Sequence, residues 1–180
     1  MPLVEQLCGK LFKVNLKNTQ NSLRKIINHT PYPEWKIGVQ FIDLDHIKEL
    51  NSTYRNVHRP TDILSFPFHE PCSPGILPNL REISSDGRIV EEMKNFGDLY
   101  LCLPYIQNMC QQYNFSIEER LPTLLVHGVC HLMGYDHETD ADYQVMSRVE
   151  DKLLLSYWSW RNELAKSQNM IHLEPIDSSA

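Results

Sequence analysis

The segment HGVCHLMGYDH, residues 127–137, constrains this 180-residue chain more than any other feature of its sequence. His127 and His131 are four residues apart, so a helix places both imidazoles on one face, one turn apart. Gly134 follows three residues later and can take the left-handed conformation that ends a helix and reverses the chain. His137 lies three residues beyond that turn, where it can fold back toward the same point. The spacing predicts that three imidazoles and a water hold one tetrahedral zinc with an open position.

The same spacing occurs in zinc proteases whose motif is H-E-x-x-H-x-x-G-x-x-H. In those enzymes the glutamate after the first histidine is the general base that deprotonates the zinc-bound water. Gly128 stands at that position in this chain, so the residues of a metal site are present without the base of the protease. A zinc metallopeptidase is therefore disfavoured, although it stays open as an alternative.

The overall composition fits one globular domain. Apolar residues make up 42% of the chain and charged residues 22%, which permits a buried core. No stretch approaches the roughly 20 consecutive apolar residues of a membrane span, so we expect no membrane partner. The five cysteines form no C-x-x-C pair, which favours reduced thiols and an intracellular location over a disulfide scaffold.

The charged residues are unevenly distributed along the chain, whose formal net charge is −6. Residues 1–60 hold nine Lys and Arg against five Asp and Glu, whereas residues 61–180 hold eight against eighteen. This balance argues against a general nucleic-acid coat protein. A basic half beside an acidic half permits a local site for a polyanion without requiring one.

Hydrophobic periodicity predicts interleaved strands and helices, and therefore a single α/β or α+β domain. The expected strands are at residues 10–17, 36–42, 61–68 and 97–103. The expected helices are at residues 19–30, 44–54, 104–113 and 139–165. Residues 69–96 contain three prolines and two glycines, which predicts one long surface loop. The polar residues 167–180 are expected to form a flexible tail, with the domain occupying residues 1–166.

One more helix is expected to carry the first two histidines and to end near Met133. Ser116 and Glu119 form a capping-box pattern, which favours a start at Ile117. Pro122 suits the first turn of a helix and favours a start at its own position. The sequence leaves both starts open.

A second group of residues lies in the block LNSTYRNVHRPTDILSFPF, residues 50–68, where Arg55 and Arg59 bracket His58. A guanidinium suits a phosphate oxygen and can stabilise the charge that develops during phosphoryl transfer. Cations are also favoured at the C-terminal end of any helix, with no further role. The residues alone leave both interpretations open.

Three blocks together resemble the YbeY family of metal-dependent endoribonucleases: residues 50–68, GDLYLCL at 97–103, and residues 127–137. They occur in the family's order, and the similar layout covers about residues 10–160. The resemblance implies an α+β single domain with a mixed sheet of about four strands, flanking helices and a zincin-like metal site. By position, His127, His131 and His137 fall on the family's zinc ligands, and Arg55 falls on the arginine that it uses for ribonuclease activity.

The resemblance therefore implies a zinc-dependent endoribonuclease, with one zinc per chain, directed at single-stranded RNA. It implies a role in small-subunit ribosomal RNA maturation and ribosome biogenesis, with ribosomal RNA and small-subunit ribosomal proteins as partners. The long 69–96 segment resembles animal members, which serve the mitochondrial ribosome, so the resemblance favours a mitochondrial location. Bacterial members are cytoplasmic, which is the location expected if the chain is bacterial. The sequence does not indicate an oligomeric state.

Two residues near these blocks are assigned no part in the chemistry. Asp62 falls on a position that varies in the family. Cys130 lies between two ligands, but a helix turns it about 100° from His131, so we expect it in the core. The alternatives to a ribonuclease are a zinc metallopeptidase and a non-catalytic ribosome-assembly factor with a structural zinc.

Overall fold

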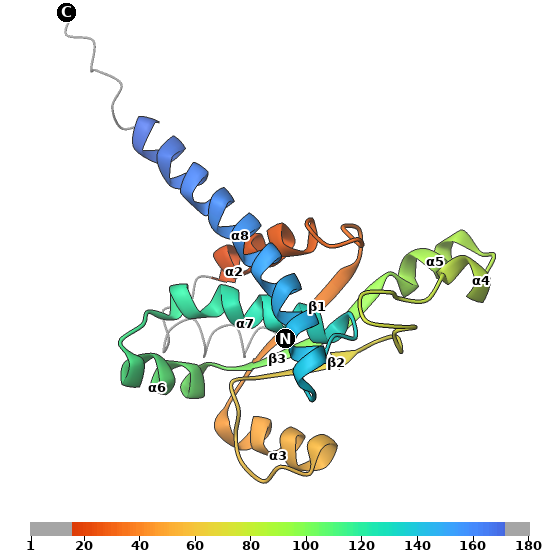
Figure 1. The fold of residues 1–180 in the computed structure, drawn as a ribbon, viewed down its shortest axis with the longest axis horizontal. Coiled ribbons are helices and arrows are strands. Elements are labelled where there is room, and N and C mark those ends of the chain that lie inside the picture. The colour runs from red at the N-terminus through yellow and green to blue at the C-terminus, as the bar shows by residue number, and fades with distance from the viewer. Residues whose placement is uncertain (1–15, 172–180) are drawn as a thin grey trace, which may run out of the picture.

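The computed structural model describes residues 16–171, which form seven helices and three strands within that range. Figure 1 shows their arrangement. In chain order the elements are α2 Leu16–Ile27, β1 Lys36–Ile42, α3 Leu44–Arg55, β2 Ile63–Pro67, α4 Leu80–Ile83, α5 Gly87–Met93, β3 Asn95–Cys102, α6 Leu103–Tyr113, α7 Ile117–Leu132 and α8 Asp140–Ile171. Among these helices, none combines the length and the apolar character that crossing a membrane requires.

The sheet has the order β1-β3-β2, with β1 parallel and β2 antiparallel to the central β3. The expected mixed sheet in an α+β domain is confirmed, but its described part has three strands rather than about four. The remaining expected strand, the first along the chain at residues 10–17, lies mostly outside the described residues. Its last two residues belong to α2, because the apolar Leu23, Ile26 and Ile27 recur at helical spacing and bury one face of that helix.

Helices cover both faces of the sheet. In Figure 1, α2, α7 and α8 lie on one side of the sheet and α3 lies on the other. Along β3 the side chains alternate: Leu99 and Leu101 join the main core with α7, whereas Cys102 joins a smaller cluster with Ile47 of α3. Because α7 packs on β2 and β3, the sheet fixes the position of the helix that carries the histidines.

The start of α7 decides between the two possibilities that the sequence left open. Ser116 caps the helix: its Oγ accepts a hydrogen bond from the Glu119 amide at 3.2 Å, and Glu119 Oε2 accepts one from the Ser116 amide at 2.9 Å. The helix therefore begins at Ile117, and a start at Pro122 is wrong. Pro122 is tolerated inside the helix because its missing amide would have bonded the carbonyl of Glu118, which lies in the exposed first turn.

The expected loop at residues 69–96 is partly helical, so the prediction of one long loop is wrong. Asn79 and Asp86 accept hydrogen bonds from the amides two residues ahead of them, and these side chains start the short helices α4 and α5. The pair α4–α5 projects from the body of the molecule in Figure 1. At the C-terminus, α8 continues to Ile171, beyond the expected domain boundary at residue 166.

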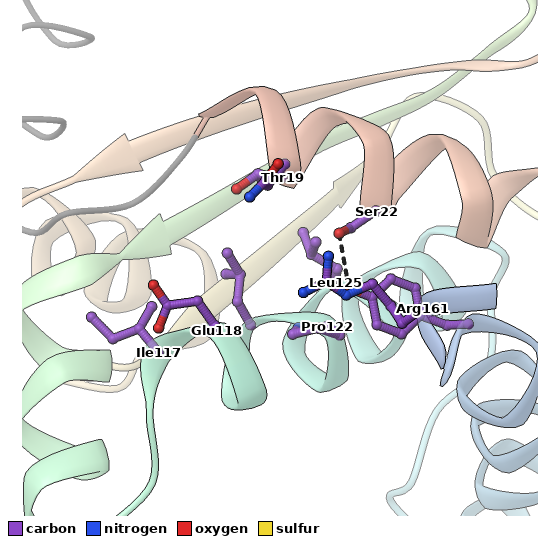
Figure 2. A pocket seen from close by; sticks show the side chains of 10 residues that line it. Thr19, Ser22, Ile117, Glu118, Pro122, Leu125 and Arg161 are labelled. Atoms are coloured by element: carbon purple, nitrogen blue, oxygen red, sulfur yellow. Dashed lines mark hydrogen bonds between the residues drawn. The ribbon is translucent and has the colours of Figure 1, made fainter. Parts of the chain in front are cut away.

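A small cavity of about 70 Å³ separates α2 from α7 and α8 (Figure 2). Ser22 of α2 and Tyr157 of α8 join across it through a hydrogen bond of 3.0 Å between their hydroxyls. Glu118 and Arg161 also line it, as Figure 2 shows. This cavity contains no histidine or cysteine and none of the residues expected in the functional site.

Candidate metal centre

The structure brings together the three histidines of the 127–137 segment. One ring nitrogen from each of His127, His131 and His137 lies within 4.8 Å of the others. The Nε2 atoms of His127 and His131, on successive turns of α7, are 3.1 Å apart. His137 returns from beyond the turn, and its ring centroid lies 5.4 Å from that of His127 and 5.0 Å from that of His131.

Gly134 makes this return possible. Its φ of +83° is in the left-handed region, which side chains with a Cβ rarely adopt. A Cβ at this position would also lie 2.6 Å from the Cβ of Pro71, in the segment after β2. That segment fastens the turn, because the Gly75 amide donates a hydrogen bond of 2.9 Å to the carbonyl of Met133.

Glu150 of α8 fixes the orientation of the His127 ring. Its Oε1 lies 2.8 Å from His127 Nδ1, and an ionised carboxylate can only accept, so Nδ1 donates. The Nε2 lone pair of His127 is then left for the cluster. Metal-binding histidines commonly donate their other ring N–H to a carboxylate in this way. The sequence analysis missed Glu150. It could have been noticed as an acidic residue on the inward-facing side of the last helix, between Val149 and Leu153.

Two groups in the helix have shifted pKa values. Burial, followed by the neighbouring His127 and His137, lowers the pKa of His131 to about 4, so this imidazole is neutral at pH 7 and can offer a lone pair. Burial also raises the pKa of the Cys130 thiol well above its usual range. Cys130 is wholly buried in the main core, which confirms the expectation that it is a core residue.

These donors fit a transition metal. Two nitrogens bound to a tetrahedral zinc at about 2.0–2.1 Å lie about 3.3 Å from each other, close to the spacing of the two Nε2 atoms in α7. Within residues 16–171, the cluster contains three histidines and no carboxylate or thiolate. Three imidazoles leave a fourth position open for water or substrate.

The histidines face a groove of about 550 Å³ that also contains Arg55. Arg55 is the last residue of α3 and is exposed, and Asn56 follows it in the left-handed conformation that ends the helix. His58 and Arg59 do not line the groove. Its lining comes from the end of α3, from β2 and the two residues before it, from α7 and from the turn after α7: Tyr54, Arg55, Thr61, Asp62, Ile63, Leu64, Ser65, Phe66, His127, His131, Gly134, Tyr135, Asp136, His137 and Glu138.

Asp62 lines the groove, but its carboxylate already has several partners. Oδ1 accepts hydrogen bonds from the Ile63 amide at 3.0 Å and from the Thr61 hydroxyl at 3.2 Å. Oδ2 lies 3.5 Å from the Arg120 guanidinium. These contacts give Asp62 a structural part at the end of the groove.

The structure gives a reason why position 128 is a glycine. Gly128 is buried against the sheet, where a Cβ would lie 2.6 Å from Leu99 and 2.8 Å from Ile63. A side chain at this position would require the terminal methyl groups of Leu99 and Ile63 to shift. The base of the zinc proteases is absent, and its position is packed against Leu99 and Ile63 of the sheet.

A cluster of three imidazoles that opens on a groove with an arginine defines a candidate metal-dependent hydrolase. Comparison with known proteins gives the family. The family model for Endoribonuclease YbeY matches residues 7–158, and the chain belongs to this family, as the sequence analysis expected.

Curated relatives extend over most of the chain. Proteins named Endoribonuclease YbeY are 32% identical in Syntrophomonas wolfei, over 76% of this chain and 81% of the relative, and 30% identical in a Thermoanaerobacter species, over 84% and 86%. These relatives are bacterial, and they give no support to the expected mitochondrial location. The solution structure of TM1509 from Thermotoga maritima has the same fold, with a TM-score of 0.51 and 24% identity over 92% of this chain and 91% of that one.

Proposed function

We propose that this chain is a zinc-dependent endoribonuclease that cuts single-stranded RNA during the maturation of small-subunit ribosomal RNA. The observation that carries the proposal is that Arg55 shares one groove with His127, His131 and His137, in a chain whose relatives are named endoribonucleases. The proposed partners are ribosomal RNA and proteins of the small ribosomal subunit.

In this proposal His127, His131 and His137 hold the metal. When bound, zinc supplies Lewis-acid polarisation of a phosphoryl oxygen and a water of lowered pKa. The chain's own residues supply orientation and charge. Glu150 keeps the proton of His127 on Nδ1, and the Arg55 guanidinium donates to phosphoryl oxygens and neutralises the charge that develops on them.

The two alternatives make different use of the same site. A metallopeptidase needs a general base, and the residue after the first histidine is Gly128, which is packed against Leu99 and Ile63. A ribosome-assembly factor would use the metal only to hold α7 to the chain after its turn. The open groove beside the histidines favours an enzyme, because a purely structural zinc site is closed by four protein ligands.

The experiment compares three forms of the full-length protein: as purified, stripped with a chelator, and reloaded with zinc. Each form is incubated with a labelled single-stranded RNA and, separately, with an unstructured peptide. We expect RNA cleavage that is lost on stripping and restored by zinc, with the peptide left intact. Cleavage of the peptide would support the metallopeptidase, whereas RNA binding without cleavage in every form would support the assembly factor.

A further inference from the structure

A second pocket, of about 220 Å³, shares one lining residue with the histidine groove. It lies between α6 and α7 and at the start of β2, and Asp62 lines both the pocket and the groove. The two hollows therefore share this lining residue. The pocket is lined by Asp62, Ile106, Met109, Cys110, Tyr113, Phe115, Arg120 and Leu124.

The pocket combines an apolar interior with two exposed aromatic rings. Ile106 and Leu124 are buried at 1% and 3% exposure. Tyr113 and Phe115 are 63% and 61% exposed and stand on either side of Asn114, whose left-handed φ of 57° ends α6. The turn between α6 and α7 thus presents two large rings to solvent beside an apolar hollow, and such a surface commonly marks a binding site.

Arg120 and Asp62 add polar groups to the pocket. The Arg120 guanidinium lies 3.5 Å from Asp62 Oδ2, in a pair that is partly open to solvent. The guanidinium has five donors, so this contact leaves others for a ligand. Arg120, Leu124 and His127 are spaced at i, i+4 and i+7 and share one face of α7, with Arg120 roughly 10 Å along the helix axis from His127.

We propose that this pocket binds one unstacked nucleobase of the RNA strand whose neighbouring phosphate lies in the histidine groove. The inference rests on the proposed function and adds to it a base-binding subsite. A nucleobase offers a flat face to Tyr113 and Phe115, as single-stranded RNA commonly does on aromatic side chains. Its polar edge offers acceptors to the Arg120 donors that the contact with Asp62 leaves unused. An apolar side chain of a protein partner would fill the interior but offer nothing to the remaining donors of Arg120.

The test is a coupling experiment on the zinc-loaded, full-length protein. A short single-stranded 2′-O-methyl oligoribonucleotide carries one abasic nucleotide, which is moved along the strand, and affinity is measured by fluorescence anisotropy. In the wild type, we expect a loss of about tenfold when the abasic nucleotide falls at one particular position. The double variant Tyr113→Ala, Phe115→Ala should bind the intact strand about tenfold more weakly than the wild type does. Placing the abasic nucleotide at that same position should then weaken its binding no further.

Three controls make the result specific. Leu155→Ala removes a side chain that is 72% exposed on α8 and outside both hollows, and it should leave the affinity unchanged. Tyr113→Phe should retain wild-type affinity, because stacking requires the ring and not the hydroxyl. On a cleavable RNA, the double variant should raise KM with little change in kcat, since the base contact lies away from the reacting phosphate.

The inference and the proposed function fail in different ways. Two results reject only the base-binding pocket, provided that the wild type cleaves RNA. In the first, the double variant binds the intact strand as tightly as the wild type does. In the second, the losses of affinity from the double variant and from the abasic nucleotide add at every position of the strand. A protein side chain would then be its better occupant. If the wild type neither binds nor cleaves RNA, both proposals are rejected.

Discussion

Glu150 Oε1 accepts a hydrogen bond from His127 Nδ1 at 2.8 Å, which ties α7, the helix of the first two histidines, to the long helix α8. The contact holds the His127 ring in the tautomer whose Nε2 faces the histidine cluster. Glu150 is thus a positioning residue that acts through His127, and it is not itself a member of the histidine cluster.

The first prediction concerns this contact. Glu150→Ala should weaken zinc binding about 10- to 100-fold, because the His127 ring loses the acceptor that orients it. Glu150→Gln should weaken binding less, since its amide oxygen can still accept from Nδ1. The affinity is measured by competition with a chromophoric chelator. Asp151→Asn is the matched control, because Asp151 is the exposed acidic neighbour on α8. Equal affinities for all these proteins would contradict the assigned part of Glu150.

The second prediction concerns the ligands themselves. The purified protein should hold about one zinc per chain, and His131→Ala should lose most of it, because two imidazoles make a much weaker site. Zinc should also raise the Tm of the wild type but not of this variant, since ligation joins α7 to the chain after its turn. Elemental analysis and thermal denaturation give the two readouts, with the exposed His46→Ala as control. Full zinc occupancy in His131→Ala would exclude the three-histidine site.

The third prediction separates the cysteines by reactivity. A raised pKa lowers the thiolate fraction at any given pH, and only the thiolate reacts readily with iodoacetamide. Burial raises the pKa of Cys130 and of Cys110, whereas Cys72 is exposed. At about pH 8.5, near the ordinary thiol value, Cys72 should be alkylated while Cys130 stays unmodified in the folded protein. Peptide mass spectrometry before and after denaturation checks this. Rapid alkylation of native Cys130 would contradict its burial.

The fourth prediction compares two glycines. Gly134→Ala should destabilise the protein by at least about 1–2 kcal/mol, because alanine disfavours the left-handed φ and its Cβ would collide with Pro71. Gly87→Ala should have the opposite sign, stabilising by roughly 0.5 kcal/mol, since a Cβ in α5 meets nothing within 4 Å. Denaturant unfolding of both variants measures the difference. A neutral Gly134→Ala would show that the turn does not require its left-handed conformation.

The grouping of the three histidines could be predicted from the sequence because all three lie within the eleven residues 127–137. Helical spacing sets His127 and His131 on one face, and a glycine three residues on is enough to reverse the chain toward His137. Cys130 could be assigned to the core by the same helical geometry.

The remaining features depend on tertiary packing or on single side chains. Arg55 lies far from the histidines in sequence, and only the position of β2 beside α7 brings the end of α3 to the same groove, so the residues alone left its role open. Glu150 reaches His127 only because α8 packs on α7. The helices α4 and α5 start at single capping residues, Asn79 and Asp86, which composition alone does not separate from loop residues.

The last prediction tests the arginine of the groove. If Arg55 stabilises the charge of phosphoryl transfer, Arg55→Ala should retain its fold and zinc while losing a factor of about 10²–10³ in the rate of RNA cleavage. Arg55→Lys should restore only part of the rate, because an ammonium cannot make the bidentate contact of a guanidinium with two phosphate oxygens. Arg59→Ala is the matched control, since Arg59 is an exposed arginine four residues further on that does not line the groove.

Rates are compared on single-stranded RNA at one salt concentration and with zinc content measured for each protein, because phosphate contacts depend strongly on salt. Arg59→Ala should change the rate by no more than the loss of one general phosphate contact. A further comparison across salt concentrations separates the two roles: losing a contact to the reacting phosphate lowers kcat at every salt, whereas losing a general charge mainly raises KM. Wild-type cleavage by Arg55→Ala would mean that this side chain is a solvated charge at the end of α3, and the assembly-factor alternative would gain support.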